Sequence, residues 1–135
     1  MTEPYEHRLT VRYAETDQMG VVHHASYVVY LEEARTRMMA ARGCSYGELE
    51  KSGIGLPIRK VDVRYRASAF YEDELVIRTQ VTRLRAASIT FGYEIVRASD
   101  EAHIATASTE LACVRLDGDR KPVPLPDELR SFAGE

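Results

Sequence analysis

The spacing of the hydrophobic residues changes once along the chain, around Gly53 and Gly55, and this change constrains the fold more than any other feature. Before it, apolar residues recur at steps of three and four over residues 26–42, which is typical of one face of a helix. After it, apolar and polar residues alternate, which is typical of half-buried strands. The helix positions are Tyr27, Tyr30, Leu31, Ala34, Met38 and Ala41.

The alternating runs predict four consecutive strands, over residues 60–68, 75–82, 88–95 and 103–116. Short turns such as 99–101 separate them, so neighbouring strands should pair antiparallel. Leu9, Val11 and Tyr13 alternate with charged or polar residues and predict one more strand before the helix. A single helix lying across a five-stranded antiparallel sheet is an α+β layer arrangement. We expect a second copy of the chain to complete one edge or face of this sheet.

Smaller signals set the boundaries of the remaining elements. Gly43 should end the long helix, and Ser45 with Glu48 forms a capping-box pattern that starts a short helix over residues 45–51. A helical turn is expected near Asp127 in the proline-containing tail. No linker or repeat interrupts the chain, which predicts a single domain over residues 1–135.

Composition excludes several classes of protein. The net charge of -3 gives no global field that would attract nucleic acid or an anionic membrane. Two cysteines, Cys44 and Cys113, are too few for a disulfide framework or a zinc site; one disulfide stays open, and two free thiols are the simpler interpretation. There is no signal peptide and no run long enough to span a membrane, so we expect a cytoplasmic protein. No phosphate-binding glycine loop or nucleophile elbow occurs, and we expect no cofactor.

Reactive polar groups are concentrated in the segment 13–24, just before the long helix. Asp17 can act as a general base on water or attack a carbonyl directly. Gly20 allows a turn that a β-carbon would block. The free N–H groups at the helix start can hold an oxyanion. The alternative is that Asp17 only caps a turn or the helix, since aspartate favours such positions.

His23 and His24 are adjacent, and adjacent side chains seldom point at one ion. No third ligand is evident, so we expect no metal, and one histidine should pack or hydrogen-bond near the loop. Charged residues on the following helix are assigned to a solvated or salt-bridged face. They are Glu32, Glu33, Arg35 and Arg37.

The run Tyr-x-Glu-Thr-Asp17-x-x-Gly20-Val-Val-His-His24-Ala-x-Tyr27, continued by Tyr30-Leu31-Glu32-x-Ala34-Arg35, resembles the 4-hydroxybenzoyl-CoA thioesterase family. It is most similar to the broad acyl-CoA thioesterase branch that includes the Tol–Pal-associated enzyme. The resemblance implies a hotdog fold, in which the sheet wraps around the long helix. It also implies a homodimer at minimum, often a homotetramer, with active sites at the dimer interface.

The resemblance assigns roles to two positions. It implies that Asp17 is the catalytic carboxylate and that the backbone N–H of His24 polarises the thioester carbonyl; it does not choose between nucleophile and general base. Two positions depart from the family pattern: Ser26 stands where asparagine is frequent, and His23 stands where an aromatic residue is frequent. Ser26 can still cap the helix, whereas His23 makes the acyl pocket more polar.

The substrate implied is an acyl-CoA, whose phosphates need cationic partners. Arg83 and Arg85 flank a predicted turn and are our candidates for phosphate contact, although surface arginines often serve only solubility. Gly20, Val22, His23 and Tyr27 are candidates for the acyl side. Two other functions stay open: a non-catalytic module that binds acyl-CoA or acyl-carrier protein, and a hotdog dehydratase, whose histidine loop we do not find.

Overall fold

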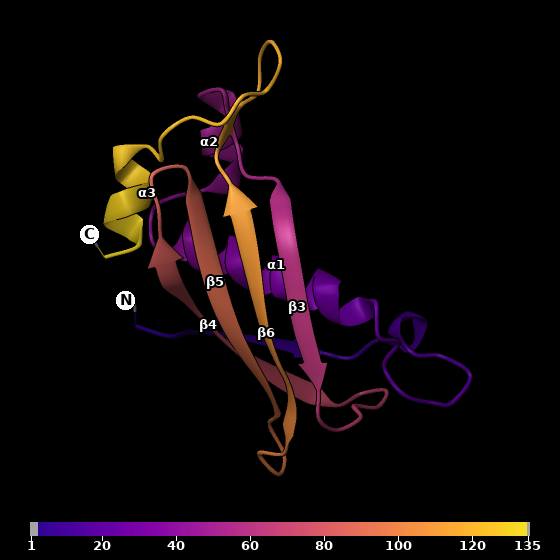
Figure 1. The fold of residues 1–135 in the computed structure, drawn as a ribbon. Coiled ribbons are helices and arrows are strands. Elements are labelled where there is room, and N and C mark those ends of the chain that lie inside the picture. The colour runs from indigo at the N-terminus through magenta and orange to yellow at the C-terminus, as the bar shows by residue number, and fades with distance from the viewer. Residues whose placement is uncertain (1–2, 135) are drawn as a thin grey trace.

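The computed structural model describes residues 3–134 and consists of one long helix lying against a five-stranded antiparallel sheet (Figure 1). The strand order is β1-β4-β5-β6-β3, so β1 and β3 form the two edges. This confirms the α+β hotdog arrangement and the five strands that the sequence predicts. The strands are β1 (Tyr5–Thr10), β3 (Ile58–Tyr65), β4 (Glu74–Leu84), β5 (Ser88–Arg97) and β6 (His103–Ala112).

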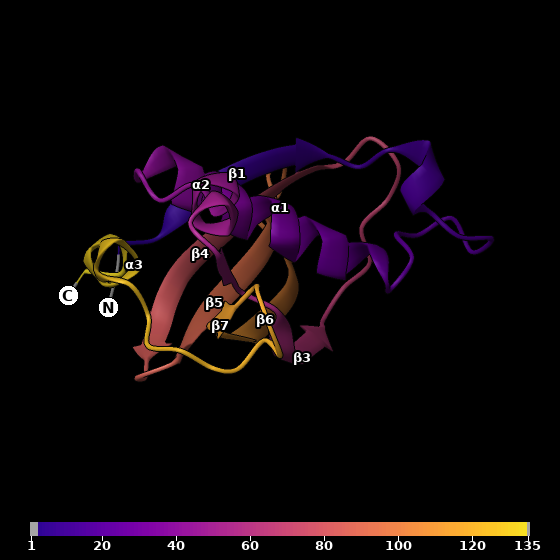
Figure 2. The same ribbon diagram turned by 90° about the horizontal axis from the view of Figure 1, so that it is seen from above.

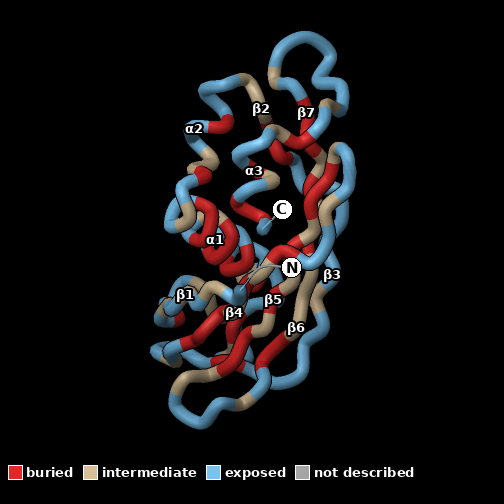
Figure 3. The backbone as a smooth tube through the Cα atoms, turned by 90° about the vertical axis from the view of Figure 1, so that its left-hand side faces the viewer, coloured by how far each residue is buried: buried red, intermediate tan, exposed pale blue. Residues whose placement is uncertain are grey.

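The long helix α1 (Ser26–Ala41) crosses the concave side of the curved sheet (Figure 2). Leu31, Ala34 and Met38 have no exposed surface, and they pack in the same core as Ile77 and Phe91 of the sheet. Full burial of a large apolar side chain contributes about 1.5–3 kcal/mol, so this contact dominates the stability of the fold. Buried residues are correspondingly concentrated on the facing sides of α1 and the sheet (Figure 3).

The opposite face of the sheet is polar. Arg78 on β4 lies between Glu6 on β1 and Glu94 on β5, with N–O distances of 3.1 and 2.9 Å. Such exposed pairs add little stability, but they keep this face hydrated and fix neighbouring strands in register. The helix-covered face is therefore the dry one, as the sequence predicts.

Two strand predictions need correction. The first strand ends at Thr10, and Tyr13 lies instead in a 3-10 turn, η1 (Tyr13–Glu15), with 76% of its surface exposed. The predicted run 103–116 is interrupted at Cys113, and β7 (Val114–Arg115) leaves the main sheet to pair with β2 (Ile54–Gly55). Gly55 lets the Leu116 side chain approach closely, because a β-carbon at this position would lie 2.6 Å from its Cδ2 atom and the leucine would have to move.

Two short helices close the end of the sheet opposite the loop 13–24. They are α2 (Tyr46–Lys51) and α3 (Asp127–Phe132). The Ser45 side chain makes no capping hydrogen bond, so the predicted capping box does not form at α2. Both cysteines of the chain are buried and unbonded to each other. None of the helices in residues 3–134 is long and apolar enough to cross a bilayer.

Candidate active site

The loop after η1 folds back on itself as a tight hairpin. The Asp17 N–H donates to the Val21 carbonyl at 2.9 Å, and the Gly20 N–H donates to the Asp17 carbonyl at 2.9 Å. Gly20 has φ +81, a conformation that strains any residue with a β-carbon, which explains the glycine. The hairpin thus holds the Asp17 backbone at a fixed place ahead of α1.

The Asp17 carboxylate is half-buried and has two different oxygens. Oδ1 accepts the Met19 N–H at 2.8 Å, so the aspartate does organise its own turn. Oδ2 accepts no hydrogen bond from any residue in 3–134. The turn-forming interpretation is therefore correct for one oxygen, while the other stays available for a proton or a carbonyl carbon.

The start of α1 differs from the sequence prediction. The residue in the N-cap position is Ala25, and Ser26 does not cap the helix; its hydroxyl donates to the Glu15 carbonyl at 3.2 Å. The Ala25 N–H donates to Nδ1 of His23 at 3.0 Å, so an imidazole takes over part of the capping. The His24 N–H donates to no acceptor in the described part of the chain. It lies at the positive end of the helix dipole, where it can stabilise an oxyanion.

His23 and His24 stack on each other with ring centroids 4.2 Å apart, and both are exposed. Because Nδ1 of His23 accepts a hydrogen bond, its neutral ring carries the proton on Nε2. In residues 3–134 no three histidine, cysteine or acidic side chains converge as metal ligands. The Tyr65 hydroxyl donates to the His24 carbonyl at 3.0 Å and ties this segment to strand β3.

The other predicted substrate-binding residues near the loop divide into two groups. Gly20 and His23 are exposed on the hairpin. Val22 and Tyr27 are buried in the chain, at 4% and 3% exposure. Val22 donates its N–H to the Ala69 carbonyl, and the Tyr27 ring packs edge-on against Tyr65. In a single chain, Val22 and Tyr27 therefore pack under the loop as part of the core. That they contact an acyl group stays a prediction.

Arg83 and Arg85 do not lie beside Asp17 in one chain. The register pairs Thr10, at the loop end of β1, with Glu74, so Arg83 sits at the other end of β4. At about 3.3 Å per residue the two ends of this strand are roughly 30 Å apart. Both arginines are exposed around the β4–β5 turn. Asp17, Gly20, His23 and His24 thus lie in one loop ahead of α1, whereas these two arginines lie at the other end of the sheet.

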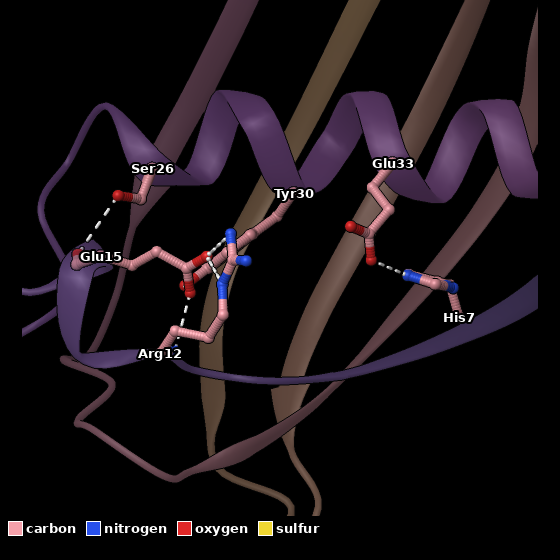
Figure 4. A network of polar contacts seen from close by, with 6 residues as sticks. All are labelled: His7, Arg12, Glu15, Ser26, Tyr30 and Glu33. Atoms are coloured by element: carbon pink, nitrogen blue, oxygen red, sulfur yellow. Dashed lines mark hydrogen bonds and ion pairs between the residues drawn. The ribbon is translucent and has the colours of Figure 1, made fainter.

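Sequence reasoning missed the residue that links the loop to the helix. The Glu15 carboxylate accepts hydrogen bonds from the Arg12 N–H and the Tyr30 hydroxyl, both at 2.8 Å (Figure 4). Burial alone would raise the pKa of Glu15, but the bonds from the Arg12 N–H, from Tyr30 and from the Arg12 guanidinium outweigh it and lower this pKa. The only signal in the sequence is its place in the motif, two residues before Asp17.

The predicted charged face of α1 also needs correction. Within residues 3–134, Glu33 pairs with His7 on β1 and not with Arg35 or Arg37 of its own helix (Figure 4). Arg35 is 4% exposed and donates to the Tyr93 hydroxyl at 3.2 Å inside the core. Its position next to Ala34 turns it toward the sheet, which overrides the usual preference of arginine for the surface.

Comparison with known proteins places this arrangement in a family. Residues 11–132 match the model of the thioesterase-like superfamily. The acyl-CoA thioester hydrolase YbgC of Escherichia coli O6:H1 is 40% identical over 90 residues, which cover 67% of each chain. The acyl-CoA thioesterase YbgC of Haemophilus influenzae is 30% identical over 122 residues, 90% of this chain and 88% of its own.

Solved structures agree in fold over almost the full length. The 1,4-dihydroxy-2-naphthoyl-CoA thioesterase Slr0204 from Synechocystis superimposes with a TM-score of 0.90 at 25% identity, covering 96% of this chain and 95% of its own. The DHNA-CoA thioesterase from Staphylococcus aureus gives a TM-score of 0.88 at 32% identity, with 96% and 85% covered.

Proposed function

This chain belongs to the thioesterase-like superfamily, and from that premise we propose that it hydrolyses the thioester of an acyl-coenzyme A. The observation that carries the proposal is that two polar groups of the loop 13–24 have no hydrogen-bond partner within residues 3–134. They are Oδ2 of Asp17 and the N–H of His24, and both residues precede α1 in the same loop. The YbgC relatives, which are named as acyl-CoA thioester hydrolases, support an acyl-CoA substrate. We further propose the branch that includes the Tol–Pal-associated enzyme.

The reaction needs little beyond these two groups. The His24 N–H binds the carbonyl oxygen as it becomes an oxyanion, a contribution of about 3 kcal/mol for one such donor. Asp17 either takes a proton from the attacking water or attacks the carbonyl carbon itself. If Asp17 acts as a base, the water oxygen bonds to the carbonyl carbon, the C–S bond breaks, and the proton taken from water passes to the leaving thiolate of coenzyme A. If Asp17 acts as a nucleophile, its oxygen bonds to the carbonyl carbon and the C–S bond breaks to give an acyl–aspartyl anhydride. Water then hydrolyses this anhydride to the free acid, and the proton released goes to the thiolate. A thiolate is a good leaving group, so no strong general acid is required.

The open edge of the sheet supports a homodimer as the working unit. Strand β3 has no neighbour on one side, and Ile58, Val61 and Tyr65 along it are 42%, 40% and 50% exposed. Two copies of β3 paired antiparallel would place the Ile58 end of one copy beside the Tyr65 end of the other. The β4–β5 turn lies at the Ile58 end, so Arg83 and Arg85 of the second copy would move to the Asp17 end. We propose this dimer, further paired into a tetramer, in the cytoplasm.

The test is a hydrolysis screen over a panel of acyl-CoAs with a free-thiol readout, on wild type and on Asp17→Asn. We expect Asp17→Asn to lower kcat by about 100-fold or more, because a positioned acid–base group contributes on that scale. Asp100→Asn is a matched control, since Asp100 accepts the Ala102 N–H at 3.1 Å in the same kind of turn. It should keep wild-type turnover.

Two outcomes would contradict the proposal. Equal turnover in Asp17→Asn and Asp100→Asn would reduce Asp17 to a turn residue. Tight binding of acyl-CoAs with no thiol released from any of them would favour the non-catalytic binding module instead.

The role of the two arginines has its own measurement. We expect the double variant Arg83→Ala, Arg85→Ala to raise KM for an acyl-CoA about tenfold while leaving KM for the matching acyl-pantetheine unchanged, because pantetheine lacks the nucleotide phosphates. Arg115→Ala is the control, since Arg115 is an exposed arginine on β7. Equal changes in KM for both substrates would exclude phosphate contact.

A further inference from the structure

We propose that Glu15 is a positioning residue for the reaction, which holds the Asp17 carboxylate and the His24 N–H at a fixed separation. The inference rests on the proposed thioesterase function and goes beyond it, because Glu15 touches neither the substrate nor a reacting atom. Its effect is exerted through the two segments that it joins.

The side chain of Glu15 is fully engaged with the chain itself. One oxygen, Oε1, accepts from the Arg12 N–H and the Tyr30 hydroxyl, both at 2.8 Å. The other, Oε2, accepts from Nε of Arg12 at 2.9 Å. Only 15% of the side chain is exposed, although it lines a cleft of about 410 Å³ between β1 and α1. A carboxylate in this state anchors structure and is not free to act as a second base.

The backbone of Glu15 reaches the same helix from a second direction. Its carbonyl accepts the His23 N–H at 2.8 Å and the Ser26 hydroxyl at 3.2 Å. Tyr30 and Ser26 both belong to α1, so Glu15 contacts the first residue of the helix and its second turn together (Figure 4).

These bonds determine which amide stays free. Because the His23 N–H is used by the Glu15 carbonyl, it cannot face a substrate, whereas the next amide, that of His24, has no acceptor within residues 3–134. Glu15 and Asp17 lie two residues apart on one arm of the hairpin, and His23 lies on the opposite arm. A shift of about 1 Å between reacting groups costs on the order of 100-fold in rate. Loosening Glu15 should therefore impair the chemical step more than substrate binding.

The protonation states agree with this geometry. The lowered pKa of Glu15 keeps its carboxylate ionised at neutral pH, and an ionised carboxylate only accepts. Burial first, and the bond to Glu15 second, raise the pKa of Tyr30, so its hydroxyl keeps the proton that it donates. The contact is thus a charge-assisted hydrogen bond, which is shorter and stronger than a neutral one.

The test compares Glu15→Ala, Glu15→Gln and Glu33→Gln. Glu33 is the matched control, because it lines the same cleft and, among residues 3–134, its carboxylate pairs only with His7. We expect Glu15→Ala to lower kcat about 30-fold, with KM and the dissociation constant of a non-hydrolysable thioether analogue of acyl-CoA changed less than threefold. Glu15→Gln keeps an acceptor for Arg12 and Tyr30 and should recover kcat to within about fivefold of wild type. Glu33→Gln should match wild type.

A second readout does not depend on activity. Amide hydrogen exchange at His23 should accelerate at least tenfold in Glu15→Ala, while exchange at Val76 in the sheet stays the same. If the wild type hydrolyses no thioester, the proposed function fails, and exchange at His23 still tests the link. Unchanged exchange at His23, or a loss of analogue affinity equal to the loss of kcat, would overturn the positioning role.

Discussion

Two polar clusters each include one residue of helix α1, and they differ in how their buried charged group is hydrogen-bonded. The loop cluster, Arg12, Glu15 and Tyr30, contains an acid with every oxygen engaged. The core cluster, Arg35, Tyr93 and Thr109, contains a guanidinium with no acid bonded to it in residues 3–134.

The core cluster is the less satisfied of the two. Nε of Arg35 and the hydroxyl of Thr79 are buried without a partner within residues 3–134, and Thr79 lies opposite Tyr93 in the strand register. A buried charge without an opposite charge is costly, so the hydroxyls that surround it matter strongly to stability. From this comparison we infer different roles for the two clusters: the loop cluster joins the loop 13–24 to α1, and the core cluster contributes to the stability of the fold.

The largest difference between the clusters should appear on deleting the Tyr93 hydroxyl. Tyr93→Phe removes the acceptor of Arg35 and the partner of Thr109, which is 2.6 Å away. We expect the free energy of unfolding to fall by about 2–3 kcal/mol, since a hydrogen bond to a charged group is lost and buried groups are left unpaired. Below the unfolding transition kcat should change less than twofold. Urea denaturation with matched kinetics measures both.

Tyr46→Phe serves as the control for this deletion. The Tyr46 hydroxyl accepts one long bond, 3.4 Å from the Leu56 nitrogen, and its loss should cost less than about 1 kcal/mol. These different roles would be wrong if Tyr93→Phe lowered kcat as much as Glu15→Ala, or destabilised the chain no more than Tyr46→Phe.

The same two clusters show where sequence reasoning succeeds and where it stops. The helix, the sheet and the Asp17 loop follow from local spacing, because hydrophobic period and turn residues are local properties. Arg35 was assigned to the surface by residue type, whereas its helical phase places it under α1. Its partner Tyr93 lies far along the chain, so no local pattern reveals the contact.

Glu15 illustrates the second limit. It stands in the motif quoted for the family resemblance, but its partners Tyr30, Ser26 and His23 meet it only when the loop folds back on α1. Arg83 and Arg85 illustrate a third limit. Their turn could be predicted from the sequence, but the end of the sheet at which it lies depends on the strand order β1-β4-β5. Roles that depend on such long-range placement need the structure.

A smaller effect, on the pH dependence of stability, has opposite signs for Glu15 and for Tyr93. The pKa of Glu15 in the folded chain is below its ordinary value of 4.5, so folding favours its ionised form. Its contribution to stability is therefore complete above about pH 4.5 and disappears as pH falls through the lower folded value. Burial raises the pKa of Tyr93 above its ordinary value of 10.0, so that contribution is complete below about pH 10 and is lost as pH rises further.

Urea denaturation of wild type, Glu15→Gln and Tyr93→Phe from pH 3 to 11 tests both pH dependences. The unfolding free energy of each variant is subtracted from that of wild type, because titrating groups common to both proteins then largely cancel. The difference between wild type and Glu15→Gln should be constant near neutral pH and shrink in acid. The difference between wild type and Tyr93→Phe should be constant in acid and shrink in base, because the core cluster contains a phenol and no carboxylate. If the Glu15→Gln difference stayed constant down to pH 3, the carboxylate would not be the group that ties the loop to α1, and the contrast between the clusters would be lost.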